Sequence, residues 1–307
     1  MKLAGEPADI NNEETNVGKN VLQILRGEDI DTVVKERIMV YGRAGVGKTR
    51  FGLSVPDDWG RIAYYAADKN SWLLRSISKE KRKRIDVFRP KGDDPTALFM
   101  QFCMTDFGDE VGTIVVDTYS KVALDSITYT ANSLTLDREK HYVVGEIGKG
   151  GIAIPNRGDY QGVDGLSKGY LDMLFDKQED KHIIFLCHEE SKQVEGMPAV
   201  GGPQHPGRQM IDYLPAQFST VIRLVRDEIM VPGADDVTPV VIAITENDGK
   251  YVAKLRTEDE EAPNPLARRV LDRNPSPWWL EYVAATSGDA KPKKKPKTGT
   301  AVGTRRS

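Results

Sequence analysis

The sequence predicts an α/β domain: a mostly parallel sheet, flanked by helices, that ends in an antiparallel hairpin. Short apolar runs alternate with helix-length stretches from Arg37 to Val283, as is typical of a parallel sheet covered by helices. The first five runs are almost continuously apolar, which indicates strands buried on both faces. The last two runs are separated by the turn residues Asp248 and Gly249, which favours an antiparallel pair at the end of the sheet.

The same pattern gives the expected elements in order. The strands are expected at 37–42, 61–68, 84–90, 113–118, 182–188, 220–227, 240–247 and 251–258. The helices are expected at 48–54, 71–83, 95–107, 121–134 and 160–177, with an amphipathic piece at 277–285. Residues 141–159 and 189–209 are rich in Gly and Pro, and loops of that length inside a domain are usually functional or disordered.

Charge is distributed unevenly along the 307 residues. We expect a disordered acidic arm over 1–19, one domain over 20–283 and a disordered basic tail over 284–307. Residues 288–307 hold five Lys and two Arg against one Asp, a net charge of +6, whereas the whole chain carries −3 and the remainder therefore −9. A body this acidic is not a general polyanion binder, so nucleic-acid contacts must come from local basic loops or from the tail.

The absence of long apolar runs and the small number of cysteines also indicate where in the cell the protein is expected. No run approaches the roughly 18 apolar residues of a membrane helix, and the first residues lack the layout of a secretory signal, so we expect no membrane contact. Cys103 and Cys187 are the two cysteines in the sequence, and both fall in apolar patterns. This excludes a disulfide framework and favours a reducing, cytoplasmic location with both thiols in the core.

Residues 42–49, GRAGVGKT, match the pattern G-x-x-x-x-G-K-[ST] between an expected strand and an expected helix. Glycines in such a loop let successive N–H groups face one anion, and the following helix adds its positive end. The motif predicts that Lys48 reaches the β- and γ-phosphates of ATP and that Thr49 ligates Mg²⁺. The alternative is a glycine-rich turn with a chance Lys-Thr. The residues expected around the nucleotide are Gly42, Arg43, Ala44, Gly45, Val46, Gly47, Lys48, Thr49 and Arg50.

Two acidic residues end predicted strands. Asp117 ends TIVVD, the position of a Walker B carboxylate that holds Mg²⁺ through water, although it would alternatively cap the next helix. Thr118 rather than Glu follows it, so a water-activating carboxylate would come from elsewhere. Asp68, at the end of RIAYYAAD, is the candidate, and its alternative role is an N-cap for the helix expected at Ser71.

The order of these features resembles the RecA-like branch of P-loop ATPases, particularly small phage-encoded members that support single-strand annealing and recombination. The similarity covers about residues 20–258. It implies DNA-stimulated ATP hydrolysis, a homo-oligomer (ring or filament) and binding to single-stranded DNA, with a single-strand-binding protein as a further partner. For a phage protein the location would be the host cytoplasm. His188, which closes HIIFLCH, matches the γ-phosphate sensor, and Asp68 stands where Glu is usual in this family.

RecA-like proteins keep their DNA loops after the Walker B helix and after the sensor strand, where the two Gly-rich segments fall. Flexible glycine with scattered cations can follow a single-strand backbone. The second segment also contains His205. The cations proposed to bind DNA are Lys149, Arg157, Lys192 and Arg208. Ordinary solvated loops are the alternative.

Lys254 and Arg256 form a K-x-R pair, which several RecA-like families use to reach the neighbouring subunit's γ-phosphate. On a strand these two side chains would share a face, and the alternative is two solvated edge cations. The basic run at 79–91 is interpreted as a solvated face rather than a DNA site. On a helix, Trp278 and Trp279 point in different directions, so we expect one ring to pack on the core while the other covers an edge. The alternative is that they form a docking motif for another protein.

Two other functions remain open at this stage. A small-molecule kinase would need an acceptor pocket and an arginine-rich lid, whereas the region after Asp117 is Gly-rich and poor in arginine. A non-hydrolysing ATP-binding scaffold would use Asp68 as a helix cap and release no phosphate.

Overall fold

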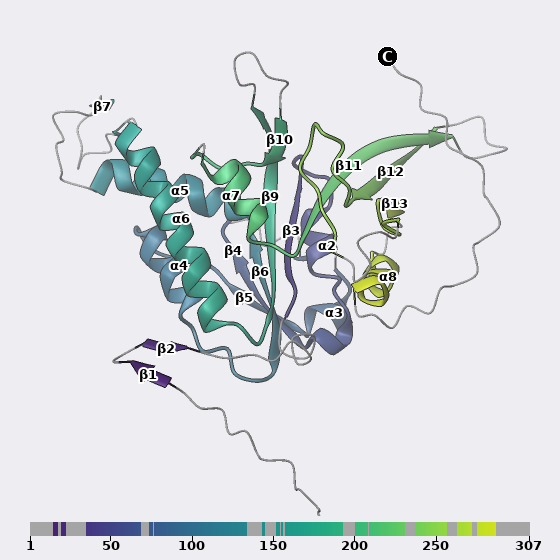
Figure 1. The fold of residues 1–307 in the computed structure, drawn as a ribbon, viewed down its shortest axis with the longest axis horizontal. Helices are drawn as coiled ribbons and strands as arrows, with labels where there is room; N and C mark the ends of the chain where they lie inside the picture. The colour runs from purple at the N-terminus through teal and green to yellow at the C-terminus, as the bar shows by residue number, and fades with distance from the viewer. Residues whose placement is uncertain are drawn as a thin grey trace, which may run out of the picture. The chain divides into compact units, whose positions relative to one another are not determined.

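A computed structural model gives the fold of the chain (Figure 1). It describes residues 15–17, 20–22, 35–68, 74–75, 77–133, 143–144, 152–153, 155, 157–192, 200–207, 209–230, 237–256, 263–271 and 275–286. The chain divides into two compact units, Met1–Val34 and Lys35–Ser307. The first contains an antiparallel pair, β1 (Thr15–Val17) and β2 (Asn20–Leu22). Most of the acidic arm and residues 287–307 of the predicted tail lie outside the described residues, whereas 284–286, predicted as disordered, end a helix.

A mixed sheet forms the centre of the second unit, in the order β13-β12-β11-β3-β9-β6-β4-β5. Neighbouring strands from β11 to β5 are parallel, whereas β12 and β13 are antiparallel and end the sheet. The strands are β3 (Arg37–Gly42), β4 (Arg61–Ala66), β5 (Ile85–Phe88), β6 (Val111–Asp117), β9 (His182–Lys192), β11 (Thr220–Met230), β12 (Val237–Ile244) and β13 (Arg268–Leu271). The α/β class and the mostly parallel sheet are therefore confirmed.

Helices cover both faces of this sheet (Figure 1). The helices are α2 (Lys48–Gly52), α3 (Lys79–Arg82), α4 (Pro95–Cys103), α5 (Tyr119–Ser133), α6 (Arg157–Lys177), α7 (Met210–Ala216) and α8 (Ser276–Thr286). Helix α4 begins where the sequence predicts, because Asp94 accepts a hydrogen bond from the Ala97 N–H (2.9 Å) and Pro95 occupies the first turn. Helix α7 was not predicted. Residues 71–73 of the predicted helix 71–83 lie outside the described part, and its regular portion is α3 alone.

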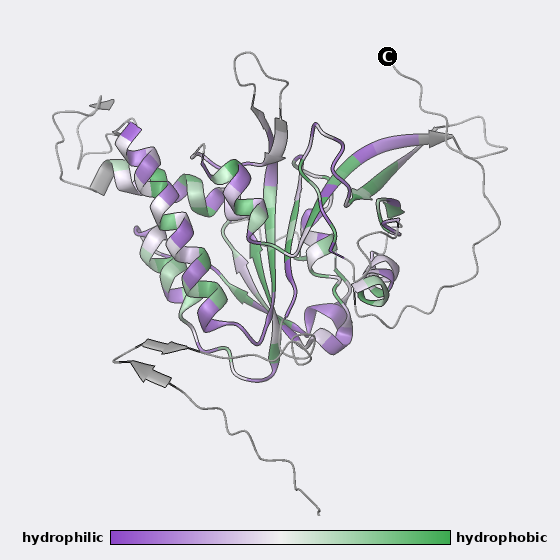
Figure 2. Ribbon diagram, viewed as in Figure 1, coloured by the Kyte–Doolittle hydropathy of each residue, from purple (hydrophilic) through white to green (hydrophobic). Residues whose placement is uncertain are grey.

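Alternation along the strands creates two cores, one on each face. The central strands of the sheet are largely hydrophobic (Figure 2). Met39 and Tyr41 of β3 face α4, α5, α6 and α7, whereas Ile38 and Val40 face α2 and α8. The apolar strands are thus buried on both sides, which explains their continuous apolar sequence. Cys103 and Cys187 are free and buried in the first core, as predicted, and burial raises the pKa of each thiol to about 12.

Both tryptophans of α8 belong to the second core. Trp278 is 4% exposed and Trp279 fully buried, and the Trp279 indole Nε1 donates to the Phe51 carbonyl oxygen at 3.0 Å. Helix α8 therefore packs against α2, the helix that follows the glycine-rich residues 42–49. This excludes the alternative that the two rings form an exposed docking motif.

The predicted terminal hairpin of 240–247 with 251–258 is wrong. The turn itself forms, since the Asp248 carboxylate accepts hydrogen bonds from the N–H groups of Lys250 (2.9 Å) and Tyr251 (2.7 Å). Strand β12, however, already pairs with β11 on one edge and β13 on the other. The chain after the turn instead makes isolated bridges, Tyr251 to Gly201 and Lys254 to Val221.

The second long loop is also more ordered than predicted. Strand β9 continues past His188 to Lys192 and pairs antiparallel with β10 (Val200–Pro203), with Glu189 opposite Pro203. In Figure 1 this pair projects beyond the edge of the sheet. In the first predicted loop, 141–159, β7 (Val143–Val144) pairs with β8 (Ile152–Ala153), and α6 already begins at Arg157.

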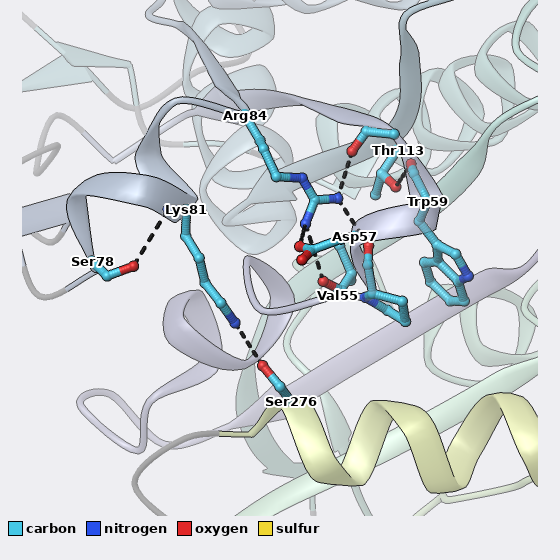
Figure 3. Close-up of polar contacts among 10 residues, drawn as sticks. Val55, Asp57, Trp59, Ser78, Lys81, Arg84, Thr113 and Ser276 are labelled. Carbon is cyan, nitrogen blue, oxygen red and sulfur yellow. Dashed lines mark hydrogen bonds and ion pairs between the residues drawn. The ribbon is translucent and has the colours of Figure 1, made fainter.

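The basic run at 79–91 is partly structural rather than a plain solvated face (Figure 3). The Arg84 guanidinium donates to the carbonyl oxygens of Pro56 (2.8 Å) and Gly60 (2.6 Å) and pairs with Asp57. Lys81 donates to the Ser276 hydroxyl at 2.6 Å, at the start of α8. Arg84 therefore stabilises the connection between α2 and β4, and Lys81 contacts the start of α8. Among the described residues, no helix has the length and apolarity needed to span a membrane.

Candidate functional site

Residues 42–49, called the P-loop after their sequence motif, follow β3 at the carboxyl edge of the sheet, and they need their glycines for two reasons. Gly45 (φ 74°) and Gly47 (φ 102°) adopt left-handed conformations that side chains with a Cβ disfavour. At Gly42 an added Cβ would lie 2.4 Å from the Leu224 carbonyl oxygen of the neighbouring strand β11. The loop is therefore shaped by its own turns and by close packing on β11.

Lys48 begins α2 with its side chain turned back over the loop. Its Nζ donates to the carbonyl oxygens of Gly42 (2.8 Å) and Arg43 (3.1 Å), and the residue is 6% exposed. Burial lowers the pKa of Lys48, while Asp117 raises it. A buried ammonium group held by neutral carbonyls gains energy when an anion enters the loop.

Asp117 meets the P-loop through Thr49. The Thr49 hydroxyl donates to Asp117 Oδ2 at 2.6 Å, across 68 residues of sequence. Burial raises the pKa of Asp117, and the hydrogen bonds from Thr49 and Tyr64 lower it. Asp117 does not cap α5, because the Thr118 hydroxyl accepts the hydrogen bond from the Lys121 N–H (3.3 Å). A hydroxyl and a carboxylate are hard oxygen donors of the kind that Mg²⁺ prefers, so the pair fits this metal.

Asp68 and His188 lie at the same edge. Ala67, next to Asp68, donates its N–H to the Asp117 carbonyl oxygen at 2.8 Å, and His188 stands directly opposite Gly42 in the sheet register. The Asp68 charge acts on Lys48, Asp117 and His188. Burial and Lys48 lower the pKa of the half-buried His188. The cap role of Asp68 concerns residues outside the described part, beginning at 69.

A hydrogen-bonded chain connects this edge to the β9–β10 pair. The His188 N–H donates to the Ser120 hydroxyl (3.0 Å), and that hydroxyl donates to the Gln204 carbonyl oxygen (2.9 Å). The Gln204 N–H returns to the His188 carbonyl oxygen (2.7 Å). Ser120, just after Asp117, and Gln204, just after β10, are thus linked through His188 of β9, the strand that pairs with β3.

A buried ion pair fixes the base of the same strand pair. Arg223 of β11 donates to both carboxylate oxygens of Glu189 (3.0 and 3.2 Å), and its guanidinium lies 3.2 Å from the centre of the Tyr251 ring. Tyr251 has room because Gly201 carries no side chain where the ring passes. Three residues farther along β11, Arg226 reaches the P-loop and donates to the Gly45 carbonyl oxygen at 2.5 Å.

The proposed DNA-binding cations are only partly described. Lys149 and Arg208 lie outside the described residues, and Lys192 ends β9 with no description of its side chain. Arg157 is exposed at the start of α6. His205 is not a surface cation: it is fully buried, its Nδ1 accepts from the Gly207 N–H (3.0 Å), and its Nε2 therefore donates to the Ser167 hydroxyl (2.8 Å).

Lys254 and Arg256 lie beside β11 rather than on a terminal hairpin. Lys254 bridges to Val221, which pairs with Met39, three residues before Gly42. That level is about 10 Å along the strand from this chain's own P-loop. Burial lowers the pKa of Lys254, and the charge of Arg256 lowers it further. Arg256 is exposed.

Sequence reasoning missed several residues of this edge. Tyr64, whose hydroxyl donates to Asp117 Oδ2 at 2.8 Å, looks like any core tyrosine in RIAYYAAD. Arg223 and Arg226 interrupt an apolar strand, which is a signal for polar contacts, but their partners are distant in sequence. Ser120 and Glu189 carried no signal beyond their closeness to Asp117 and His188. No protein-family model matches this chain, and no curated protein matches it.

Proposed function

We propose that this chain is a Mg²⁺-dependent RecA-like P-loop ATPase that acts on single-stranded DNA in phage recombination or strand annealing. The observation that carries the proposal is the meeting of Thr49 with Asp117 at 2.6 Å beside buried Lys48. A phosphate-binding loop, a cation and a metal-binding carboxylate then occupy one edge of a parallel sheet. Ligands of such sheets bind outside the carboxyl ends of the strands.

The residues take distinct roles in ATP hydrolysis. Lys48 would exchange its two carbonyl acceptors for phosphate oxygens. Thr49 and Asp117 would hold Mg²⁺, with the Thr49 hydroxyl still donating to Asp117, and the metal would supply charge neutralisation for phosphoryl transfer. Asp68 orients the attacking water, and His188 contacts the γ-phosphate.

DNA enters the proposal through the β9–β10 pair. His188 is bound through Ser120 to Gln204, the residue after β10. A strand of DNA bound by Lys192 and its neighbours would shift the position of β10. The hydrogen bonds from Gln204 through Ser120 would pass that shift to His188. That coupling gives DNA-stimulated hydrolysis a physical route.

Measuring the ATPase rate with and without unstructured single-stranded DNA tests the proposal directly. We expect Mg²⁺-dependent phosphate release that rises with DNA. Asp117→Asn should keep the fold and lose this turnover, because the amide keeps the shape but drops the charge facing the metal. Asp68→Asn should bind ATP normally and hydrolyse it slowly.

Other outcomes of these experiments would favour other functions. Binding of ATP with no phosphate release, with or without DNA, would favour the scaffold alternative. Phosphate transfer to a small hydroxyl compound would favour the kinase. An unchanged rate in Asp68→Asn would remove Asp68 from the chemistry.

A further inference from the structure

Asp117 has a second hydrogen-bond donor besides Thr49. The hydroxyl of Tyr64 donates to Asp117 Oδ2 at 2.8 Å, the same oxygen that Thr49 reaches at 2.6 Å. Both donors and the carboxylate are buried or half-buried. Two donors on one oxygen fix the rotation of the carboxylate about its own bond. They leave Oδ1 as the oxygen that can face a metal ion or a metal-bound water.

The sheet register explains why Tyr64 provides this contact. Ala66 stands directly opposite Asp117, and Tyr64 stands opposite Val115, two residues earlier on each strand. Residues two apart share a face, so Tyr64 and Asp117 are diagonal neighbours within reach of a long side chain. The Ala66 side chain has no polar group, so the hydrogen bond to Asp117 comes from Tyr64, two residues earlier on the same strand.

The Tyr64 hydroxyl is a permanent donor. A tyrosine hydroxyl carries its hydrogen at neutral pH. Thr49, in contrast, must serve the metal and Asp117 at once, with one hydrogen and its lone pairs. Tyr64 has no such second duty, so it holds Asp117 in place whichever way the Thr49 hydroxyl turns.

We infer that Tyr64 is a positioning residue for the metal site, acting through Asp117. This inference rests on the proposed function. Hydrogen bonds to groups that ligate or face a metal orient those groups, and their removal typically weakens metal binding by about 10- to 100-fold. We expect an effect near the lower end, about tenfold, because Thr49 still donates to the same oxygen.

The test compares Tyr64→Phe with Tyr65→Phe. Both variants lose one buried phenolic hydroxyl, but Tyr65 faces the other core, where it packs on Phe99 and Phe102. Binding of Mn²⁺ in the presence of a non-hydrolysable ATP analogue is followed by the electron paramagnetic resonance signal of free Mn²⁺. Binding of the analogue alone is measured in EDTA, and thermal unfolding reports the fold.

Tyr64→Phe should bind Mn²⁺ about tenfold more weakly than wild type, with unchanged affinity for the analogue in EDTA, and Tyr65→Phe should match wild type in both. Equal Mn²⁺ affinity in Tyr64→Phe and wild type would overturn the inference, as would equal weakening in both variants. A Tyr64→Phe protein that fails to fold would assign the hydroxyl to stability instead. If wild type binds neither the analogue nor Mn²⁺, the proposed function itself has failed.

Discussion

The two sides of the P-loop differ in how they are built. On one side, β4 and β6 bring Tyr64 and Asp117 to Thr49 through strands that are buried on both faces. On the other side, Arg223, Glu189 and Tyr251 hold the β9–β10 pair and the segment after β12 by an ion pair and isolated bridges. The first side gathers the residues proposed to bind phosphate and metal. The second side depends on the ion pair and the isolated bridges, so we expect it to move more readily when a partner binds.

Lys48→Ala gives the largest expected effect and tests the first side. The variant lacks the buried cation that faces the loop, so ATP affinity should fall about 100-fold and turnover should reach background. Calorimetric titration with ATP measures this. Lys79→Ala, an exposed lysine at the start of α3, is the matched control. Wild-type ATP affinity in Lys48→Ala would remove the P-loop assignment.

Arg256→Ala tests whether the second side acts on a neighbouring subunit. A cation that reaches a neighbour's γ-phosphate stabilises transition-state charge only after assembly, so turnover should fall about 10³-fold and rise with protein concentration in wild type. The experiment mixes Arg256→Ala subunits, intact in the P-loop, with Lys48→Ala subunits, intact at Arg256. Hydrolysis should appear in the mixture and in neither variant alone. Full activity of isolated Arg256→Ala monomers would contradict catalysis in trans.

Arg223→Met probes the ion pair that holds the β9–β10 pair. The side chains of Arg223 and Glu189 are 13% and 6% exposed. Removing one partner leaves the other charge buried and unpaired, which should lower the free energy of unfolding by about 3 kcal/mol. Urea unfolding measures the change. The double variant Arg223→Met, Glu189→Leu should recover most of it, because no charge is left unpaired.

A matched control is the exposed ion pair between β13 and β11. Arg268 pairs with Asp227 at 2.9 Å, but both side chains are about half exposed. Arg268→Met should therefore change the free energy of unfolding by less than about 1 kcal/mol. Equal losses in Arg223→Met and Arg268→Met would show that burial of the first pair does not matter for stability.

The smallest expected effect separates the basic tail from the loops. Deletion of 288–307 should weaken single-stranded DNA binding a few-fold at moderate salt, since it removes diffuse charge only. Replacing Lys192 and Arg208 together by Ala should weaken binding more, lower the salt slope by about 1.4 and reduce DNA-stimulated hydrolysis. Fluorescence anisotropy over a salt series measures both. If the tail deletion removes all binding, the loop assignment is wrong.

The sequence by itself determined the features that depend on neighbouring residues. Most strands and helices followed from periodicity, and the loop motif was recognised in eight contiguous residues, of which Gly45 and Gly47 adopt left-handed conformations. Asp117 was selected as a candidate because it ends an apolar strand that follows the loop motif in the sequence. In each case the physical cause lies within one turn or one strand, so the signal is local.

The tertiary structure alone decided which strands lie side by side and therefore which residues meet. Strand β9 lies between β3 and β6, and β12 pairs with β13 rather than with the segment holding Lys254. Tyr64 became a partner of Asp117, and His205 a buried residue, only through contacts between distant segments. Apolar strands are chemically alike, so their pairing is set by the packing of the whole domain, which no local pattern records.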